Sequence, residues 1–416
     1  MKAKSKQDKN VPNLRFPKFQ NEWVTVKIKN FGTIVTGNTP PTKDIDNYGN
    51  DYLWASPADL GLSKYITDTK SMLSAKGFKK TRKIPQGSIL VTCIGSTIGK
   101  MGMAIKEMAT NQQINSIIVN EDFDCNFVYY ALNSQFPKYL SSISMQAVPI
   151  ISKSVFEELS NYSTTIEEQE KIGNLLSLLD DRISTQSQII EKIETLIKGL
   201  KEALFSQHFR FKDNNGKCFP NWTEKKLGDI GDFQTSSINK LSKENEKEVY
   251  LVNYMNVYRH ENINNNTIKS FQIVTTKDSQ IESCNLKEGD ILFTPSSETP
   301  DDIGHSVVIF EDLNNAVFSY HLMRFRPKIE LEILYSHYFC NTPSILSQLS
   351  RLATGSTRFT ISVKSFSSIK ILLPSISEQK KIANLLASID KKIETEKQIL
   401  KEYTEQKKYL LANMFI

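Results

Sequence analysis

The chain has 416 residues, of which 39% are hydrophobic and 10% aromatic, as is ordinary for a soluble globular protein of two or three domains. Five cysteines lie far apart without a CxxC pair and five histidines form no HExxH motif, which argues against a disulfide scaffold and structural zinc. No run approaches the ~18 apolar residues of a membrane span. We expect a reduced, cytoplasmic protein with no membrane association.

The net charge of +6 is unevenly distributed. Residues 1–22 hold six Lys or Arg and two Asp or Glu, whereas residues 210–375 hold nineteen of each kind. We therefore predict a flexible basic tail over residues 1–22. Phosphate binding depends on local clusters rather than on net charge, and the densest cluster is KKTRK at residues 79–83. A solvated charged turn explains that cluster equally well.

Residues 23–165 are predicted to form a mixed α+β domain. Short runs rich in β-branched residues, such as ILVT (89–92) and NSIIV (115–119), are set among turn residues. The stretch VYYALNSQF (128–136) has a helical pattern instead.

The stretch ILVTCIGSTIGKMGM (89–103) resembles a strand followed by a phosphate-binding loop. A Walker loop needs four residues between its glycines and a Ser or Thr after its lysine. Here only three residues separate Gly95 from Gly99, and Met101 follows Lys100. The spacing therefore argues against a nucleotide site.

Residues 166–209 are predicted to form one long helix. Thr165 and Glu168 occupy the positions of a capping box at its start. Apolar residues then recur by alternating steps of three and four, which is typical of a coiled coil; a long helix lying on its own globular domain is the alternative. The predicted seam of this helix consists of Ile172, Leu176, Leu179, Ile183, Ile190 and Ile193.

The same design is written a second time. Thirteen of the 24 pairs between residues 166–189 and residues 376–399 are identical at a constant offset of 210. Weaker sequence similarities occur upstream of these two segments, in the same order. They include GSILVT (87–92) and GDILFT (289–294), which are followed by IGK and IGH respectively. Internal repeats of this kind imply two similar structural units. The second domain is expected over residues 210–375.

The second long helix is expected over residues 376–416, with Ser375 and Glu378 as its capping box. Gln186 and Glu396 interrupt the two stripes at equivalent places, where polar residues can fix the register. Each helix can bury its stripe against the other in an antiparallel coiled coil, which relates the two α+β domains by a pseudo-two-fold axis. The predicted seam of the second helix consists of Ile382, Leu386, Ile389 and Ile393.

With these motifs the chain resembles the specificity subunits of Type I restriction-modification systems. The resemblance is carried by the FP…W entry of each copy, by TGNTPPTKDIDNYGNDYLWASPADL (36–60), by GSTRFTISVKSF (355–366), and above all by the paired IEEQEKIGNLLSLLDDRI and ISEQKKIANLLASIDKKI. It implies two target recognition domains that each read one half of a split, asymmetric site in double-stranded DNA. It also implies a helical spacer that docks two modification (methyltransferase) subunits, with restriction subunits joining later.

Polar residues on loops after predicted strands are the candidate DNA contacts, because Arg pairs with guanine edges, Asn and Gln with adenine, and Lys, Ser and Thr with phosphate. Each is also explained by an ordinary solvated loop. The first-domain candidates are Asn38, Thr39, Lys43, Lys79, Lys80, Arg82 and Lys100. The second-domain candidates are Asn253, Asn256, Arg259, Ser296, Ser297, Thr357 and Arg358. The segment 145–152 differs from its counterpart GSTRFTIS, so the contact expected of Arg358 is not carried to the first domain.

No catalytic residues, bound cofactor or metal are expected in this chain. NTPPT (38–42) resembles the Asn-Pro-Pro-aromatic motif of adenine methyltransferases, but Thr39 intervenes and no aromatic residue follows the prolines. S-adenosylmethionine and ATP with magnesium are therefore expected on the partner subunits. The alternative function is a coiled-coil scaffold that joins two protein-binding domains without touching DNA.

Overall fold

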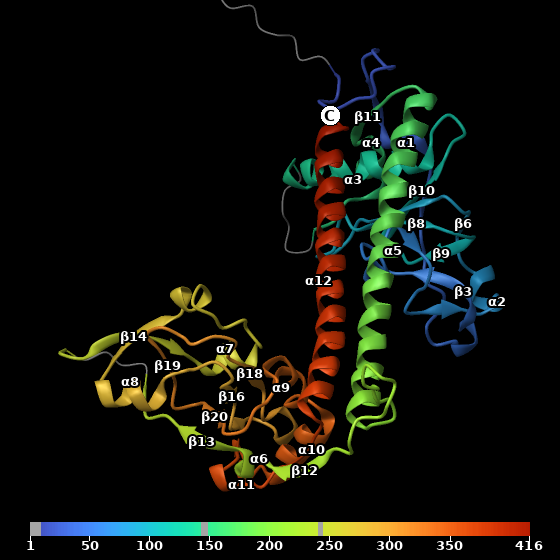
Figure 1. The fold of residues 1–416 in the computed structure, drawn as a ribbon. Coiled ribbons are helices and arrows are strands. Elements are labelled where there is room, and N and C mark those ends of the chain that lie inside the picture. Colours follow the sequence, from blue (N-terminus) through green and yellow to red (C-terminus); the bar gives the residue numbers. More distant parts are fainter. Residues whose placement is uncertain (1–9, 143–148, 240–243) are drawn as a thin grey trace, which may run out of the picture. The chain divides into compact units, whose positions relative to one another are not determined.

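The computed structural model describes residues 10–142, 149–239 and 244–416. The chain divides into two compact units, one formed by residues up to 190 together with residues 396–416, and the other by residues 191–395. The two long helices, α5 (Ile166–Phe205) and α12 (Ile376–Asn413), each contribute one part to either unit (Figure 1). None of the described helices is long and apolar enough to cross a membrane.

The first unit is organised around a five-stranded sheet of order β2-β10-β7-β8-β4, with a second sheet of order β5-β3-β9-β6 and the pair β1-β11. Its strands are β1 (Val24–Lys27), β2 (Gly32–Thr36), β3 (Tyr48–Ala55), β4 (Tyr65–Ile66), β5 (Met72–Leu73), β6 (Lys83–Ile84), β7 (Ile89–Thr92), β8 (Met101–Ala104), β9 (Met108–Thr110), β10 (Ile114–Val119) and β11 (Ser160–Ser163). Its shorter α-helices are α1 (Ile28–Phe31), α2 (Ala75–Lys79), α3 (Cys125–Ser142) and α4 (Lys153–Glu158).

The second unit has a four-stranded sheet of order β13-β20-β16-β18, a three-stranded sheet of order β15-β14-β19, and the pairs β12-β22 and β17-β21. Its strands are β12 (Thr223–Lys226), β13 (Gly231–Thr235), β14 (Lys247–Val252), β15 (Gln272–Thr276), β16 (Ile291–Phe293), β17 (Ser296–Ser297), β18 (Ser306–Val308), β19 (Ala316–Phe318), β20 (Met323–Pro327), β21 (Phe359–Thr360) and β22 (Lys370–Leu373). Its shorter α-helices are α6 (Leu227–Ile230), α7 (Tyr254–Tyr258), α8 (Asp278–Cys284), α9 (Ile333–Phe339), α10 (Pro343–Leu352) and α11 (Val363–Ser367).

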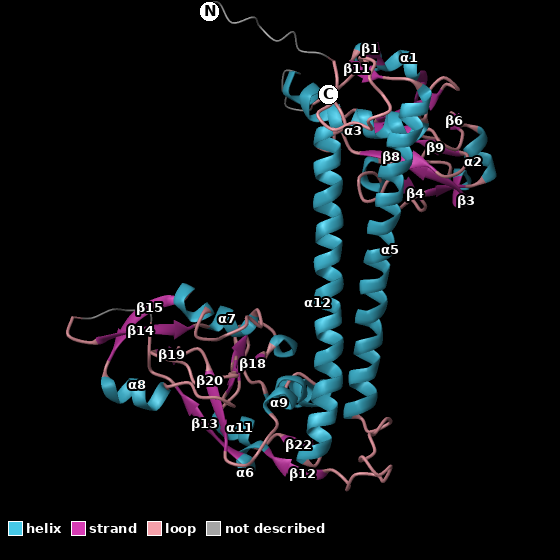
Figure 2. Cartoon of the chain, turned by 45° about the horizontal axis from the view of Figure 1, so that its top comes forward, coloured by secondary structure: helices cyan, strands magenta, loops and turns pink. Residues whose placement is uncertain are grey.

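The two units repeat one topology, which confirms the predicted internal repeat of mixed α+β domains (Figure 2). The sheet order β2-β10-β7-β8 of the first unit corresponds to β13-β20-β16-β18 of the second, and the pair β1-β11 corresponds to β12-β22. A parallel pairing recurs as well, between β3 and β9 in one unit and between β14 and β19 in the other.

The apolar stripes of the long helices are buried, but their ends pack into the domain cores. Ile172 and Leu176 belong to the same apolar cluster as Trp23 and Phe415 of the first unit. Ile382 and Leu386 likewise join the second unit's core, in which Trp222 is buried. The heptad pattern alone predicted a seam between the two helices along their whole length. In the structure the ends of each stripe also pack into the domain cores. The remaining predicted seam residues are buried or half-buried, namely Leu179, Ile183, Ile190, Ile193, Ile389 and Ile393.

Polar contacts show that the helices run antiparallel within the first unit. The side chain of Gln186 donates hydrogen bonds to the backbone oxygen of Glu396, at 3.1 Å, and to its carboxylate. Six residues nearer the start of α5, Lys407 pairs with Asp180 at 2.5 Å. The two polar interruptions of the stripes therefore face each other, where they can fix the register.

The segment from residue 10 to residue 22 was predicted as part of a flexible tail, but it packs against the first unit. The Leu14 amide donates to the Asn413 carbonyl at 2.8 Å, and Arg15 binds Glu168 at 2.6 Å. Composition alone could not reveal this, because the partners lie far away in sequence. Residues 1–9 of the predicted tail lie outside the described residues.

Candidate nucleic-acid interface

The glycine loop at residues 93–100 connects two antiparallel strands, β7 and β8. A P-loop instead leads from a strand into a helix whose first amides hold the phosphates. The Gly99 amide donates to the Thr92 carbonyl and the Thr92 amide to the Lys100 carbonyl, which closes a hairpin. This geometry agrees with the spacing argument against a nucleotide site and leaves Lys100 exposed at the end of the loop.

The second unit builds the same hairpin with a different loop. The Gly304 amide donates to the Thr294 carbonyl and the Thr294 amide to the His305 carbonyl. Gly99 and Gly304 have φ angles of 89° and 88°, in the left-handed region that favours glycine. The retained glycine thus fixes the turn, and His305 occupies the place that Lys100 has in the first unit.

In the first unit, Asn38 holds the basic turn that contains KKTRK. Its side-chain amide donates to the Lys80 carbonyl at 3.0 Å, and its side-chain oxygen accepts the Arg82 amide at 2.8 Å. Thr39 bonds to Gln112 through its hydroxyl. Both candidates are therefore engaged inside the domain, and Asn38 positions the turn.

The cations of this turn differ in their pairing. Lys80 is 3.1 Å from Asp44 and 2.8 Å from the Asn47 side chain, and the Arg82 guanidinium donates to the Thr36 carbonyl at 2.8 Å. Lys43 and Lys79 are exposed on either side. The structure thus brings Lys79, Lys80 and Arg82 together on one turn held by Asn38.

Asn38→Ala is expected to loosen this turn without changing which bases are recognised. The substitution removes two hydrogen bonds to the backbone of residues 80–82, each worth about 0.5–1.5 kcal/mol. Hydrogen-exchange mass spectrometry should show faster exchange in peptides covering residues 79–83 and little change in the second unit. A changed base preference with normal exchange would instead assign Asn38 to direct readout.

In the second unit, the candidates converge on the short antiparallel strand pair of β17 and β21. The Arg358 guanidinium donates to the Ser296 hydroxyl at 3.1 Å, and the Tyr254 hydroxyl donates to the Ser296 carbonyl at 3.1 Å. Ser297 is buried and bonds to the Thr299 carbonyl. Arg358 is exposed, so its free guanidinium edge can reach a ligand while Ser296 orients it.

The remaining candidates of this unit surround α7. Asn256 accepts the Asn253 amide at 2.8 Å and donates to Glu261 at 2.7 Å, so its side chain serves the local fold. Arg259 and Thr357 are exposed. Arg259, Thr357 and Arg358 are therefore the accessible candidates, with Asn253 half-buried beside them.

The first unit has the counterpart of this strand pair, because Ile94 pairs with Ile150 as Ser296 pairs with Thr360. In the aligned sequences Val148 corresponds to Arg358, but residues 143–148 lie outside the described residues. The structure therefore gives the first unit no described equivalent of the Arg358 contact.

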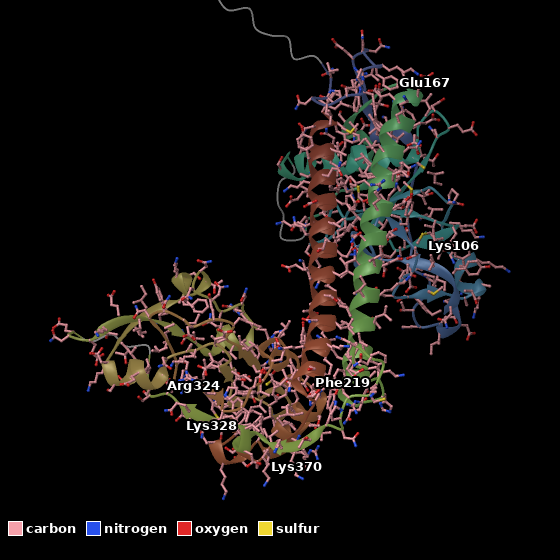
Figure 3. All side chains as sticks on the ribbon, viewed as in Figure 1. Lys106, Glu167, Phe219, Arg324, Lys328 and Lys370 are labelled. Carbon is pink, nitrogen blue, oxygen red and sulfur yellow. The ribbon has the colours of Figure 1, made fainter. Side chains whose placement is uncertain are left out.

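Other cations of the second unit are neutralised by carboxylates. Lys370 of β22 pairs with Glu224 at 2.9 Å, and Lys328, just after β20, pairs with Asp232 at 2.6 Å (Figure 3). Surface pairs of this kind contribute little stability, but they lower the local positive potential. Lys370 and Lys328 are thus poorer candidates for phosphate binding than Arg358.

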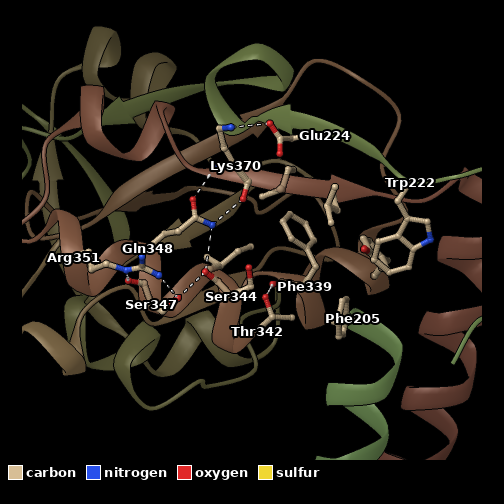
Figure 4. A pocket seen from close by; sticks show the side chains of 14 residues that line it. Phe205, Trp222, Glu224, Phe339, Thr342, Ser344, Ser347, Gln348, Arg351 and Lys370 are labelled. Carbon is tan, nitrogen blue, oxygen red and sulfur yellow. Dashed lines mark hydrogen bonds and ion pairs between the residues drawn. The ribbon is translucent and has the colours of Figure 1, made fainter. Parts of the chain in front are cut away.

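A cavity of about 350 Å³ lies where α10 meets β22 and the end of α5 (Figure 4). Aromatic side chains line one side, including Trp222 and Phe339. Its polar groups are already bonded to one another, since Gln348 donates to the Lys370 carbonyl at 2.9 Å and accepts the Lys370 amide at 2.9 Å. The cavity opens to solvent beside the exposed residues Glu224 and Arg351, and Gln348 and Lys370 bond to each other rather than remaining free as catalytic groups would. In the described part of the chain, no three His, Cys, Asp or Glu side chains are grouped as metal ligands.

Sequence reasoning missed a group of aromatic and imidazole rings beside Arg358. The rings of Tyr254 and Tyr258 are stacked at 5.7 Å, and His305 lies 4.5 Å from Tyr258 and 5.3 Å from His260. The available signal was YMNVYRH (254–260), which places three rings on one short helix and its end. Aromatic rings and arginines can stack on nucleic-acid bases that are not paired.

The fold is an internal duplication of one α+β unit. A long helix follows each copy, and each long helix contributes one part to either unit. A family model described as the Type I restriction modification DNA specificity domain matches residues 20–195 and again residues 220–405. The chain belongs to this family and is a specificity subunit of a Type I restriction-modification system.

Relatives and solved structures agree with this assignment. The MjaIX specificity subunit of Methanocaldococcus jannaschii is 29% identical over 77% of this chain and 79% of its own length. The MjaVIII specificity subunit of the same organism is 24% identical over 98% and 94%. The crystal structure of the S subunit from M. genitalium shares the fold, with a TM-score of 0.60, 18% identity, and coverage of 98% of this chain and 99% of that one.

Proposed function

We propose that each unit reads one half of a bipartite, asymmetric site in double-stranded DNA, and that the paired helices set the half-site spacing and dock two methyltransferase subunits. The observation that carries the proposal is the repeated hairpin, β7 with β8 and β16 with β18. In both units its retained glycine holds a basic or imidazole side chain at the loop end, while the loop between differs. A constant frame with a variable loop suits two domains that bind the same polymer at different sequences.

The chemistry of the exposed groups supports DNA as the ligand. Arg358 can place two donors on a guanine edge or a phosphate, and Lys79, Lys80 and Lys100 can contact phosphates. The first unit presents mainly lysines, whereas the second presents Arg358 with the rings of Tyr254 and Tyr258. Different half-site sequences are the expected consequence.

The chain itself is proposed to be non-catalytic, with S-adenosylmethionine and ATP with magnesium bound by the methyltransferase and restriction subunits. The hairpin at Gly99 is not a P-loop, and the polar groups of the cavity at Trp222 are satisfied by one another. We place the complex in the cytoplasm, where its DNA is found.

Mapping of methylated bases in cells that carry this chain and its methyltransferase tests the proposal. A single bipartite motif should appear, and it should disappear when the chain is deleted. Binding of the purified complex to a duplex with that motif should weaken steeply with salt, because phosphate contacts release counterions. A protein-binding scaffold would instead give no motif and no steep salt dependence of DNA binding.

Arg358→Ala should relax recognition at one half-site only, because the second unit contacts only its own half. A lost base contact costs about 1–3 kcal/mol. Methylome sequencing should then show one degenerate position in one half of the motif. Arg351→Ala is the matched control, since this exposed arginine lies on α10 and bonds to Ser347 of the same helix. Equal loss at both halves would remove Arg358 from base readout.

A further inference from the structure

His260, His305 and Asp302 form a continuous hydrogen-bonded network in the second unit. The Nδ1 atom of His260 is 3.1 Å from the Ser306 carbonyl oxygen, and its Nε2 atom is 3.2 Å from Nδ1 of His305. The Nε2 atom of His305 is 2.9 Å from Oδ1 of Asp302. All four ring nitrogens are therefore used within the domain.

The groups at the two ends of this hydrogen-bonded network determine how many protons the two histidines hold. The carbonyl of Ser306 and the carboxylate of Asp302 can only accept, so His260 Nδ1 and His305 Nε2 must both donate. The contact between the rings needs one further proton. Two imidazoles then hold three protons where a neutral pair holds two, so the His260–His305 pair carries one positive charge.

The surroundings place that charge on the ring next to the carboxylate. Burial lowers the pKa of His260, which favours its neutral form. His305 lies against Asp302, whose other oxygen accepts the Tyr258 hydroxyl at 3.1 Å. An ion pair of His305 with Asp302 satisfies both groups.

This hydrogen-bonded network lies next to the candidate DNA contacts. Tyr258 stacks on Tyr254, and Tyr254 bonds to the same Ser296 that orients Arg358. His305 also occupies the hairpin position that Lys100 has in the first unit. The first unit therefore has a lysine at this position and the second unit has an imidazole hydrogen-bonded to Asp302.

We propose that the shared proton of His260 and His305 holds Asp302 neutralised beside the DNA-binding face, so that second half-site binding weakens as pH rises while first half-site binding does not. The inference rests on the proposed DNA-reading function. His305 acts as a positioning residue, because none of its nitrogens is free to contact DNA.

The sign follows from the charges. With the proton present, Asp302 and the histidine pair sum to zero. Without it, the hydrogen bond between the rings is lost, and the negative charge of Asp302, which still accepts from Tyr258 and His305, is no longer offset and repels phosphate. Of the charged or titratable groups nearby, Tyr258 contacts His305 and Asp302, and His337 lies near His260. Tyr254 and Glu298 lie near Tyr258, Arg358 lies near Tyr254, and Asp301 accepts the Ser350 hydroxyl.

These neighbours do not supply the same change of charge. The pKa of Tyr254 is raised by burial and that of Tyr258 by its bond to Asp302, so both phenols stay neutral. Burial lowers the pKa of His337, which keeps that ring neutral as well. These three neighbours therefore do not account for a change of charge beside Asp302.

Fluorescence anisotropy on the full methyltransferase complex tests the proposal. Two duplexes would each keep one half of the methylome-defined motif and scramble the other. Between about pH 6 and about pH 8.5 we expect one duplex to lose roughly fivefold to tenfold in affinity, the scale of one phosphate contact, and the other to change little. Equal loss on both duplexes, or no loss on either, would overturn the proposal.

Substitutions test whether the loss of affinity comes from the network of His260, His305 and Asp302. His305→Lys keeps the positive charge at all these pH values, as Lys100 does, and should abolish the loss. Asp302→Asn removes the carboxylate and should also flatten the pH profile. His208 is exposed and does not belong to this network, so His208→Gln should behave like the wild type. A loss that persists unchanged in both His305→Lys and Asp302→Asn contradicts the role of the pair.

Nitrogen-15 NMR of the histidine-labelled chain separates this inference from the proposed function. In the low-pH samples the spectrum should show one ring with two protons, whose signals are missing in His305→Lys, and a second ring that is the neutral Nδ1–H tautomer. Two neutral rings would refute the shared proton whether or not DNA binds. Absence of DNA binding at every pH and salt, with the NMR signature intact, would refute the proposed function and with it the role of the proton in DNA binding.

Discussion

Arg210→Ala is expected to destabilise the second unit by about 3–5 kcal/mol, because it leaves a buried carboxylate without its charged partner. The Glu378 side chain has no exposed surface and receives Arg210 at 2.8 Å and 3.1 Å and the Trp222 indole at 3.1 Å. A loss of this size is a large fraction of a domain's stability. Hydrogen-exchange mass spectrometry should show faster exchange around β12, β22 and the start of α12, with the first unit protected as before.

Two controls make the test specific. Adding Glu378→Gln to Arg210→Ala removes the buried charge and should recover part of the stability. Arg15→Ala should produce the same pattern in the first unit, since Arg15 binds Glu168, whose side chain is also fully buried, at 2.6 Å and 2.7 Å. If Glu378→Gln gives no recovery, the cost of Arg210→Ala does not come from the buried carboxylate.

These glutamates also show where sequence patterns stop being informative. Thr165 with Glu168 and Ser375 with Glu378 have capping-box spacing, and the Ser375 hydroxyl does accept the Glu378 amide at 3.4 Å. The two carboxylates, however, bind arginines about 150 or more residues earlier in the chain. The start of each helix was predictable because its signal is local, whereas the carboxylate's partner was not.

The same distinction separates the predictable parts of the fold from the others. The repeat and the long helices follow from spacing and periodicity, which need only neighbouring residues. The internal bonds of Asn38 and the histidine chain from His260 to Asp302 depend on how loops meet in the folded domain. Residue type could propose Asn38 for adenine readout, but only the tertiary contact with residues 80–82 shows that its amide is occupied.

Lengthening both helices by one heptad is expected to lengthen the unread spacer of the DNA site and leave both half-site sequences unchanged. Because Gln186 and Glu396 bond to each other across antiparallel helices, one insertion directly after Gln186 and one directly before Glu396 add seven residues to both helices on the same side of the bonded pair. The heptad keeps the apolar stripe in phase and extends each helix by about 10 Å. Base pairs are about 3.4 Å apart, so the spacer can grow by at most about three base pairs.

Methylome sequencing of this double insertion gives the decisive readout, and an insertion after Gln186 alone is the matched control. The single insertion puts the bonded pair out of register and should abolish methylation. The double insertion should either give the longer spacer or, if the added twist of about 20° per heptad and the shift along the DNA are not absorbed, lose activity as well. Altered half-site bases with an unchanged spacer would contradict the model, because a rigid spacer moves the recognition domains without changing the loops that contact the bases.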